Sequence, residues 1–207
     1  EGRHPTILLL HGADGMRDAL IYQCLAKQLV QQGYVTLIAH YFERTETERI
    51  KPKAIEEKLF VAWRETVRQA VLYAAGLPEV DRRRIGLLGF SLGAYLSLAV
   101  AAQADVPVAA VADFFGGLPK KLHANAKGLP PVLIVHGDKD KTVPVEEALD
   151  LEKLLRQHKR IYEKKIYEKQ EHLFGGHYLD ADARDAWERT LTFFGKYLQL
   201  PRAVWAP

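Results

Sequence analysis

Short apolar runs alternate with longer helix-patterned segments along nearly the whole chain, and this alternation limits the possible folds more than any other feature of the sequence. The apolar runs predict strands at residues 6–10, 34–40, 85–90, 108–115 and 132–136, and a segment rich in lysine and glutamate at 161–167 suits a strand at a sheet edge. Apolar residues at helical spacing predict helices at 16–32, 54–75, 92–102, 145–157 and 181–198. Strands separated by helices form a parallel sheet covered on both faces, so the chain is expected to be a single α/β domain spanning residues 1–207.

The connections between these elements are short. The polar stretch 43–52 has no clear period and is expected to be a loop. The interval between residues 115 and 132 is too short for a large cap domain.

Charge and hydropathy exclude several classes of function. The 29 lysines and arginines nearly balance the 26 aspartates and glutamates, so the net charge of +3 predicts no nucleic-acid surface. No apolar run approaches the roughly 20 residues of a membrane span. The single cysteine, Cys24, allows no internal disulfide, and its place in an amphipathic pattern predicts a small buried residue. A cytoplasmic location is favoured, a removed N-terminal signal stays open, and oligomeric state is undetermined.

The strongest chemical signal is Gly89-Phe90-Ser91-Leu92-Gly93, a G-x-S-x-G sequence between an apolar strand and a helix. This context is typical of the nucleophile elbow of the α/β-hydrolase fold, in which a strained strand-to-helix turn holds a serine above the sheet. The flanking glycines remove side chains that would collide with neighbouring backbone. Ser91 is therefore the predicted nucleophile.

A serine nucleophile needs a base within hydrogen-bond reach and a carboxylate to orient that base. In this fold both follow the serine in the chain, the acid first and then the histidine. Residues 138 and 140, after the strand at 132–136, are both aspartates. We favour Asp140 because Asp138 adjoins Gly137, where a turn residue is expected. Asp113, near the end of the preceding strand, is a third candidate.

Two histidines, His172 and His177, follow the last strand and Asp140. The other six precede Asp140 or, for His158, end a helix on the outside of the sheet. His172 is favoured because it lies a short loop beyond the strand and is followed by an apolar pair, and His177 remains the alternative.

Backbone N–H groups must stabilise the oxyanion that forms when the serine attacks. We assign one donor to Leu92, after the nucleophile, and one to Ala13, in the glycine-containing loop after the first strand. Tyr41 and Phe42, with the polar stretch after them, are expected to form a substrate-binding rim. His11 and His136 both stand in His-Gly at strand ends, where structural hydrogen bonding is their expected role.

The sequence contains no clear pattern of a metal site or of a phosphate-binding loop. No clustered cysteine and histidine spacing accompanies His172 and His177, and no glycine-rich segment has the lysine of a phosphate-binding loop. We expect neither a metal nor a cofactor.

The sequence resembles the dienelactone hydrolase family over nearly its whole length. The resemblance rests on several segments, which are residues 9–12, 80–81, 85–93, 115–117, 136–137 with Asp140, Val143 and Pro144, 167–174, and 193–194. The family's histidine typically comes five residues after a tyrosine and two before a phenylalanine, a frame that Tyr167, His172 and Phe174 fit. Family members that act on dienelactones carry a cysteine nucleophile and a glutamate after the first strand, where this chain has Ser91 and Gly12. The resemblance therefore implies a carboxylic-ester or thioester substrate rather than a dienelactone.

These observations predict a cofactor-free serine hydrolase that acts on small to medium acyl esters through an acyl-enzyme on Ser91. Two alternatives remain. One is an acyltransferase with the same three side chains, and the other is a non-catalytic ligand-binding relative. The expected partner is a small-molecule ester.

Overall fold

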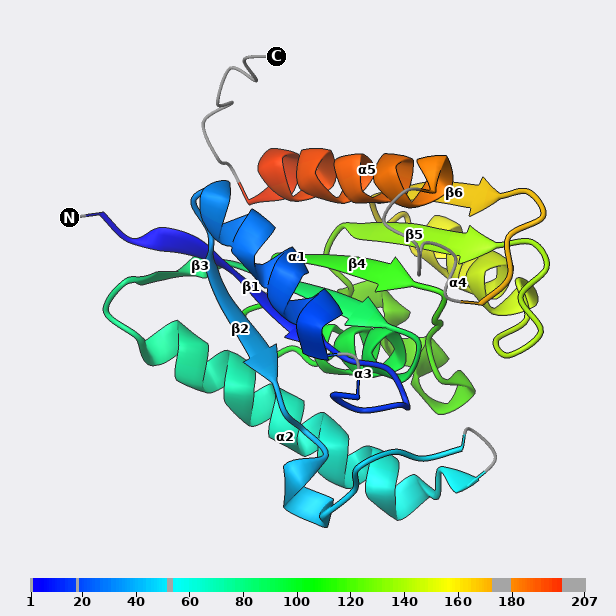
Figure 1. Ribbon diagram of the computed structural model, residues 1–207, viewed down its shortest axis with the longest axis horizontal. Helices are drawn as coiled ribbons and strands as arrows, with labels where there is room; N and C mark the ends of the chain where they lie inside the picture. The colour runs from blue at the N-terminus through cyan, green and yellow to red at the C-terminus, as the bar shows by residue number, and fades with distance from the viewer. Residues whose placement is uncertain (1, 18, 52–53, 173–179, 199–207) are drawn as a thin grey trace.

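The computed structural model describes residues 2–17, 19–51, 54–172 and 180–198, and they form one central sheet with helices on both faces (Figure 1). The sheet has six strands in the order β2-β1-β3-β4-β5-β6, and every neighbouring pair is parallel. The strands are β1 (His4–Leu10), β2 (Val35–Ala39), β3 (Val80–Phe90), β4 (Ala110–Phe114), β5 (Val132–Gly137) and β6 (Tyr162–Tyr167). The predicted fold class is confirmed.

Five α-helices are described, and they cover the two faces separately. They are α1 (Ala19–Gln31), α2 (Glu57–Gly76), α3 (Leu92–Ala101), α4 (Glu146–Gln157) and α5 (Ala181–Tyr197). Buried residues of α2, α3 and α4 pack into one apolar cluster with one face of the sheet. Buried residues of α1 and α5 pack into a second cluster on the other face (Figure 1). This burial on both faces explains why the central strands read as continuous apolar runs.

Most element ends differ from prediction by a few residues, and two of these differences have a local cause. β3 begins at Val80, five residues early, because its first residue pairs with His4 of β1 before the register shifts between His4 and Thr6. α1 begins at Ala19 rather than residue 16, because the preceding loop makes a turn in which the Gly15 N–H donates to the Gly12 carbonyl. The polar stretch after β2 contains a short 3₁₀ helix at Glu43–Thr45, and the β4–β5 connection contains another at Lys120–Gly128.

The lysine- and glutamate-rich strand lies at the edge of the sheet, as predicted. Its charged side chains pair with the neighbouring helices. Lys164 pairs with Glu152 of α4, and Glu163 accepts a 2.9 Å hydrogen bond from Lys196 of α5. Charged side chains on an edge strand disfavour its pairing with a strand of another molecule.

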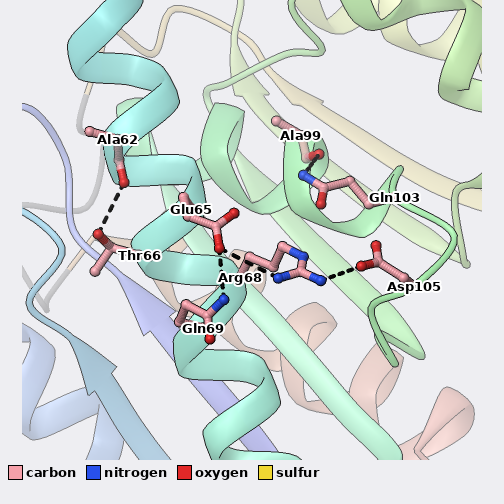
Figure 2. A network of polar contacts seen from close by, with 8 residues as sticks. All are labelled: Ala62, Glu65, Thr66, Arg68, Gln69, Ala99, Gln103 and Asp105. Atoms are coloured by element: carbon pink, nitrogen blue, oxygen red, sulfur yellow. Dashed lines mark hydrogen bonds and ion pairs between the residues drawn. The ribbon is translucent and has the colours of Figure 1, made fainter.

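A polar network joins α2 to the turn that follows α3 (Figure 2). The Arg68 guanidinium contacts Glu65 on its own helix and Asp105 beyond the end of α3. Gln103 donates to the carbonyl of Ala99 in the same region. The network therefore links α2 to the turn that follows the C-terminal end of α3.

The prediction that Cys24 is buried is wrong, because the cysteine is exposed. On α1, Leu25, Ala26 and Leu29 pack against the sheet. Because only one side of a helix can face the sheet, Cys24 lies on the solvent-exposed side. In the described residues, no helix is long and apolar enough to cross a membrane.

Candidate active site

Ser91 lies between β3 and α3 in a strained conformation. Its φ of 53° and ψ of −117° fall outside the regions that non-glycine residues normally occupy. Hydrogen bonds hold the residue from both sides. The Ser91 N–H donates to the Phe114 carbonyl at 2.9 Å, and the Ser91 carbonyl accepts from the N–H of Ala94 at 2.9 Å. Strain maintained in this way fixes the side chain at the carboxyl edge of the sheet.

The glycines on either side of Ser91 are required by close packing. A Cβ built on Gly89 would lie 2.6 Å from the Ala94 Cα, inside any permitted contact distance. A Cβ on Gly93 would collide with the backbone of Leu10 and His11 at the end of β1. Both glycines therefore allow α3 to start directly against the sheet.

The structure brings Ser91, His172 and Asp140 together. His172 Nε2 lies 3.1 Å from Ser91 Oγ, and His172 Nδ1 lies 2.6 Å from Asp140 Oδ2. With the proton on Nδ1, the histidine donates to the carboxylate and accepts from the serine, which is the arrangement that a general base requires. The three side chains come from segments after β3, β5 and β6.

Asp140 is held as a buried carboxylate. Its Oδ1 accepts two backbone hydrogen bonds, from the N–H groups of Thr142 and Val143, each 2.8 Å long. His136 lies against the other oxygen, with Nε2 3.4 Å from Oδ2 and 2.8 Å from the Val143 carbonyl. Burial lowers the pKa of His136, so this ring is neutral and donates to the Val143 carbonyl.

The two other acid candidates lie elsewhere. Asp138 Oδ1 accepts from the Lys169 N–H at 2.6 Å, which ties the β5 loop to the segment after β6. Asp113 is fully buried on β4, and neither carboxylate oxygen has a hydrogen-bond partner among the described residues. Burial, with a smaller contribution from the charge of Glu147, raises the pKa of Asp113 to about 8. Only Asp140 contacts His172 among these three aspartates.

The loop after β1 lies beside Ser91. A Cβ on Gly12 would come within 3.5 Å of the Ser91 Cβ, so this backbone passes close to the nucleophile. The Gly12 N–H donates to the Tyr22 hydroxyl at 3.1 Å, and the Ala13 carbonyl accepts from the Ile50 N–H at 2.8 Å. Leu92 is the first residue of α3, where helix N–H groups have no partner within the helix. Ala13 and Leu92 therefore belong to the two segments that flank Ser91.

Tyr41, expected to form part of a substrate-binding rim, is buried behind the surface. The ring is fully buried, stacks on His11 at 4.1 Å between centroids, and its hydroxyl donates to the His11 carbonyl at 2.6 Å. The pKa of His11 is lowered to about 4, chiefly by burial, so the imidazole is neutral near pH 7. Phe42 is almost buried and lines a hollow of about 460 Å³ between the loop after β1 and the segment after β2. Tyr41 thus stabilises the loop after β1 through its stacking contact and its hydrogen bond with His11.

Sequence reasoning missed Phe115. Its φ of 44° lies in the left-handed region, which a bulky residue rarely adopts, and its ring contacts His172 at 4.9 Å between centroids. The signals in the sequence are its position at a strand end before two glycines and its place in the family-like segment 115–117. His177, the alternative base, lies outside the described residues. Among the residues described, no group of three or more acidic, histidine or cysteine side chains is placed to hold a metal ion.

A parallel sheet with helices on both faces, carrying a serine, a histidine and an aspartate hydrogen-bonded at its carboxyl edge, defines an α/β hydrolase. The chain belongs to the dienelactone hydrolase family, whose family model matches residues 1–198. It is therefore a hydrolase, and its family points to the hydrolysis of esters.

Individual relatives agree with this assignment. The chain is 25% identical over 223 residues to a carboxymethylenebutenolidase of Rhodococcus opacus, covering 98% of this chain and 85% of the relative. The crystal structure of a putative dienelactone hydrolase from Klebsiella pneumoniae subsp. pneumoniae MGH 78578 matches with a TM-score of 0.79 and 22% identity, over 95% of this chain and 89% of the other. Esterase PE8 matches with a TM-score of 0.68 and 20% identity, over 95% and 94%. At these identities the two structures show a shared fold.

Proposed function

We propose that the protein hydrolyses carboxylic esters or thioesters of small to medium acyl groups through an acyl-enzyme on Ser91. The observation that carries this proposal is the unbroken set of hydrogen bonds from Ser91 Oγ through His172 to Asp140.

The geometry supports a two-step reaction. His172 Nε2 takes the proton of Ser91 Oγ as the oxygen attacks the ester carbonyl, and Asp140 stabilises the imidazolium that forms. The N–H groups of Leu92 and Ala13 receive the oxyanion. The imidazolium then gives its proton to the leaving alcohol or thiol. In the second step His172 activates a water molecule, which releases the acyl group and regenerates Ser91.

Labelling with a serine-directed fluorophosphonate tests the nucleophile. Wild type and Ser97→Ala should be labelled, and Ser91→Ala should not. Ser97 is a matched control because it lies on α3 and donates only to the Gly93 carbonyl, at 2.8 Å. Folded wild-type protein that fails to react at Ser91 contradicts the proposal.

Ester turnover tests the chemistry and the acyl size. Ser91→Ala should lower kcat by at least about 10⁴-fold. Because the described residues contain no large cap domain, p-nitrophenyl acetate and butyrate should be better substrates than the palmitate ester. The opposite chain-length order would refute the assignment to small and medium acyl groups.

His172 and His177 are compared in the same assay. His172→Ala should abolish turnover, and His177→Ala should retain most of it. Full activity in His172→Ala would instead assign the base to His177.

A further inference from the structure

An apolar pocket of about 300 Å³ lies between α1 and α5, at the carboxyl ends of β3 and β4. Its walls are mainly aromatic and aliphatic side chains, which include Ile21, Leu25, Phe90, Phe115, Ala183 and Trp187. These two helices lie on the same face of the sheet (Figure 1). We call this feature the α1–α5 pocket.

The α1–α5 pocket adjoins the candidate active site through two residues. Phe115 lines the pocket, and its ring also contacts the His172 imidazole at 4.9 Å between centroids. Phe90 lines the pocket as well and directly precedes Ser91. Phe115 therefore belongs both to the pocket wall and to the surroundings of the histidine.

Trp187 lines the pocket, and the position of its indole N–H shows which part of the ring faces it. The Nε1 of Trp187 is buried and has no hydrogen-bond acceptor among the described residues. A buried N–H group is normally paired. Because this N–H is covered while the pocket is open to a water-sized molecule, other atoms of the Trp187 ring face the pocket.

The position beside His172 determines which half of an ester belongs there. In acyl transfer, the Ser91 Oγ–carbonyl bond forms and the carbonyl–alcohol bond breaks, while the serine proton passes through His172 Nε2 to the departing alcohol oxygen. The alcohol half must therefore lie on the histidine side of the serine. A cavity of about 150 Å³ takes up benzene, so a pocket twice that size accommodates a substituted ring.

We propose that the α1–α5 pocket binds the alcohol half of the substrate, and that this half is an apolar, ring-containing alcohol. This inference rests on the proposed function and names the substrate class of the same site.

The first test fills the pocket. Ala183→Phe places a ring in the α1–α5 pocket, and Ala181→Phe is the matched control because Ala181 is exposed on the same helix. We measure kcat/KM for 4-methoxybenzyl acetate and for ethyl acetate, which share the acetyl group. The kcat/KM for 4-methoxybenzyl acetate divided by that for ethyl acetate should fall at least tenfold in Ala183→Phe and stay unchanged in Ala181→Phe. Ala183→Leu replaces Ala183→Phe if the larger side chain prevents folding.

The second test measures binding without turnover. In the Ser91→Ala variant, 4-methoxybenzyl alcohol should shift the indole N–H resonance of Trp187 in a saturable manner. The shift should disappear when Ala183→Phe is added and persist with Ala181→Phe. A Trp187→Phe variant assigns the resonance.

The outcomes separate the two proposals. If ethyl acetate is hydrolysed in a Ser91-dependent way but all variants give the same ester ratio, the pocket assignment is overturned and the proposed function stands. If Ser91 neither reacts with fluorophosphonate nor supports hydrolysis, the proposed function fails and the alcohol assignment fails with it. Absence of a Trp187 shift at saturating alcohol also overturns the pocket assignment.

Discussion

Asp140 and His172, which are 32 positions apart in the chain, are joined by a 2.6 Å contact between Oδ2 and Nδ1. The aspartate has no freedom to turn away, because its other oxygen accepts the Thr142 and Val143 N–H groups. The carboxylate therefore holds the imidazole in the tautomer that leaves Nε2 free to accept the serine proton.

Replacement of this carboxylate by an amide should remove most of the activity. In Asp140→Asn the histidine loses its preference for the productive tautomer, and kcat for a small ester should fall by roughly 10³–10⁴-fold. The matched control is Asp113→Asn, which alters a buried aspartate that does not contact His172 and should retain activity within about tenfold. The reverse order of the two variants would transfer the acid role to Asp113.

Tyr41 should matter for the loop after β1 rather than for substrate affinity. Tyr41→Phe keeps the ring that stacks on His11 but leaves the buried His11 carbonyl without its 2.6 Å donor. The free energy of unfolding should fall by about 1–3 kcal/mol, with little change in KM. Tyr34→Phe is the control, because the buried Tyr34 hydroxyl has no partner among the described residues and its loss should cost little. A large rise in KM with unchanged stability would instead make Tyr41 a substrate contact.

Two glycines, Gly89 in β3 and Gly195 in α5, should respond in opposite directions to replacement by alanine. Gly89→Ala forces a Cβ into the backbone of α3 and should prevent folding or lower stability by several kcal/mol. Gly195→Ala, inside α5, meets no atom within 4 Å and should raise stability by about 0.5–1 kcal/mol, because alanine loses less backbone entropy. Urea unfolding of both variants checks this. An innocuous Gly89→Ala would mean that the turn around Ser91 is looser than the packing indicates.

Periodicity was sufficient to predict which segments form strands and helices, although not their ends, because burial on both faces of a parallel sheet leaves a strong local pattern. Ser91, Asp140 and His172 were predictable because turn chemistry and chain order restrict where such groups occur in this fold. The burial of Tyr41, the exposure of Cys24 and the conformation of Phe115 depend on contacts between distant segments. Those contacts cannot be predicted from the local sequence pattern.

Asp113 should make stability depend on pH. In the folded protein its carboxyl keeps the proton up to about pH 8, because burial and the charge of Glu147 disfavour the ionised form. In the unfolded chain the same group ionises near pH 4. Between these values the folded state binds more protons, so the free energy of unfolding should decrease as pH rises.

Asp113→Asn replaces this carboxyl with a neutral group of the same shape. The variant should match wild type near pH 4 and become more stable than wild type towards pH 8, by up to about 1.4 kcal/mol for each pH unit in this window. Urea unfolding at pH 5 and pH 7.5 measures the difference, with Asp150→Asn on the exposed side of α4 as the control. If wild type and Asp113→Asn lose stability equally between the two pH values, the buried carboxyl is not protonated in the folded protein. If wild type loses stability between the two pH values and Asp113→Asn does not, the pH dependence comes from the buried carboxyl of Asp113 on β4.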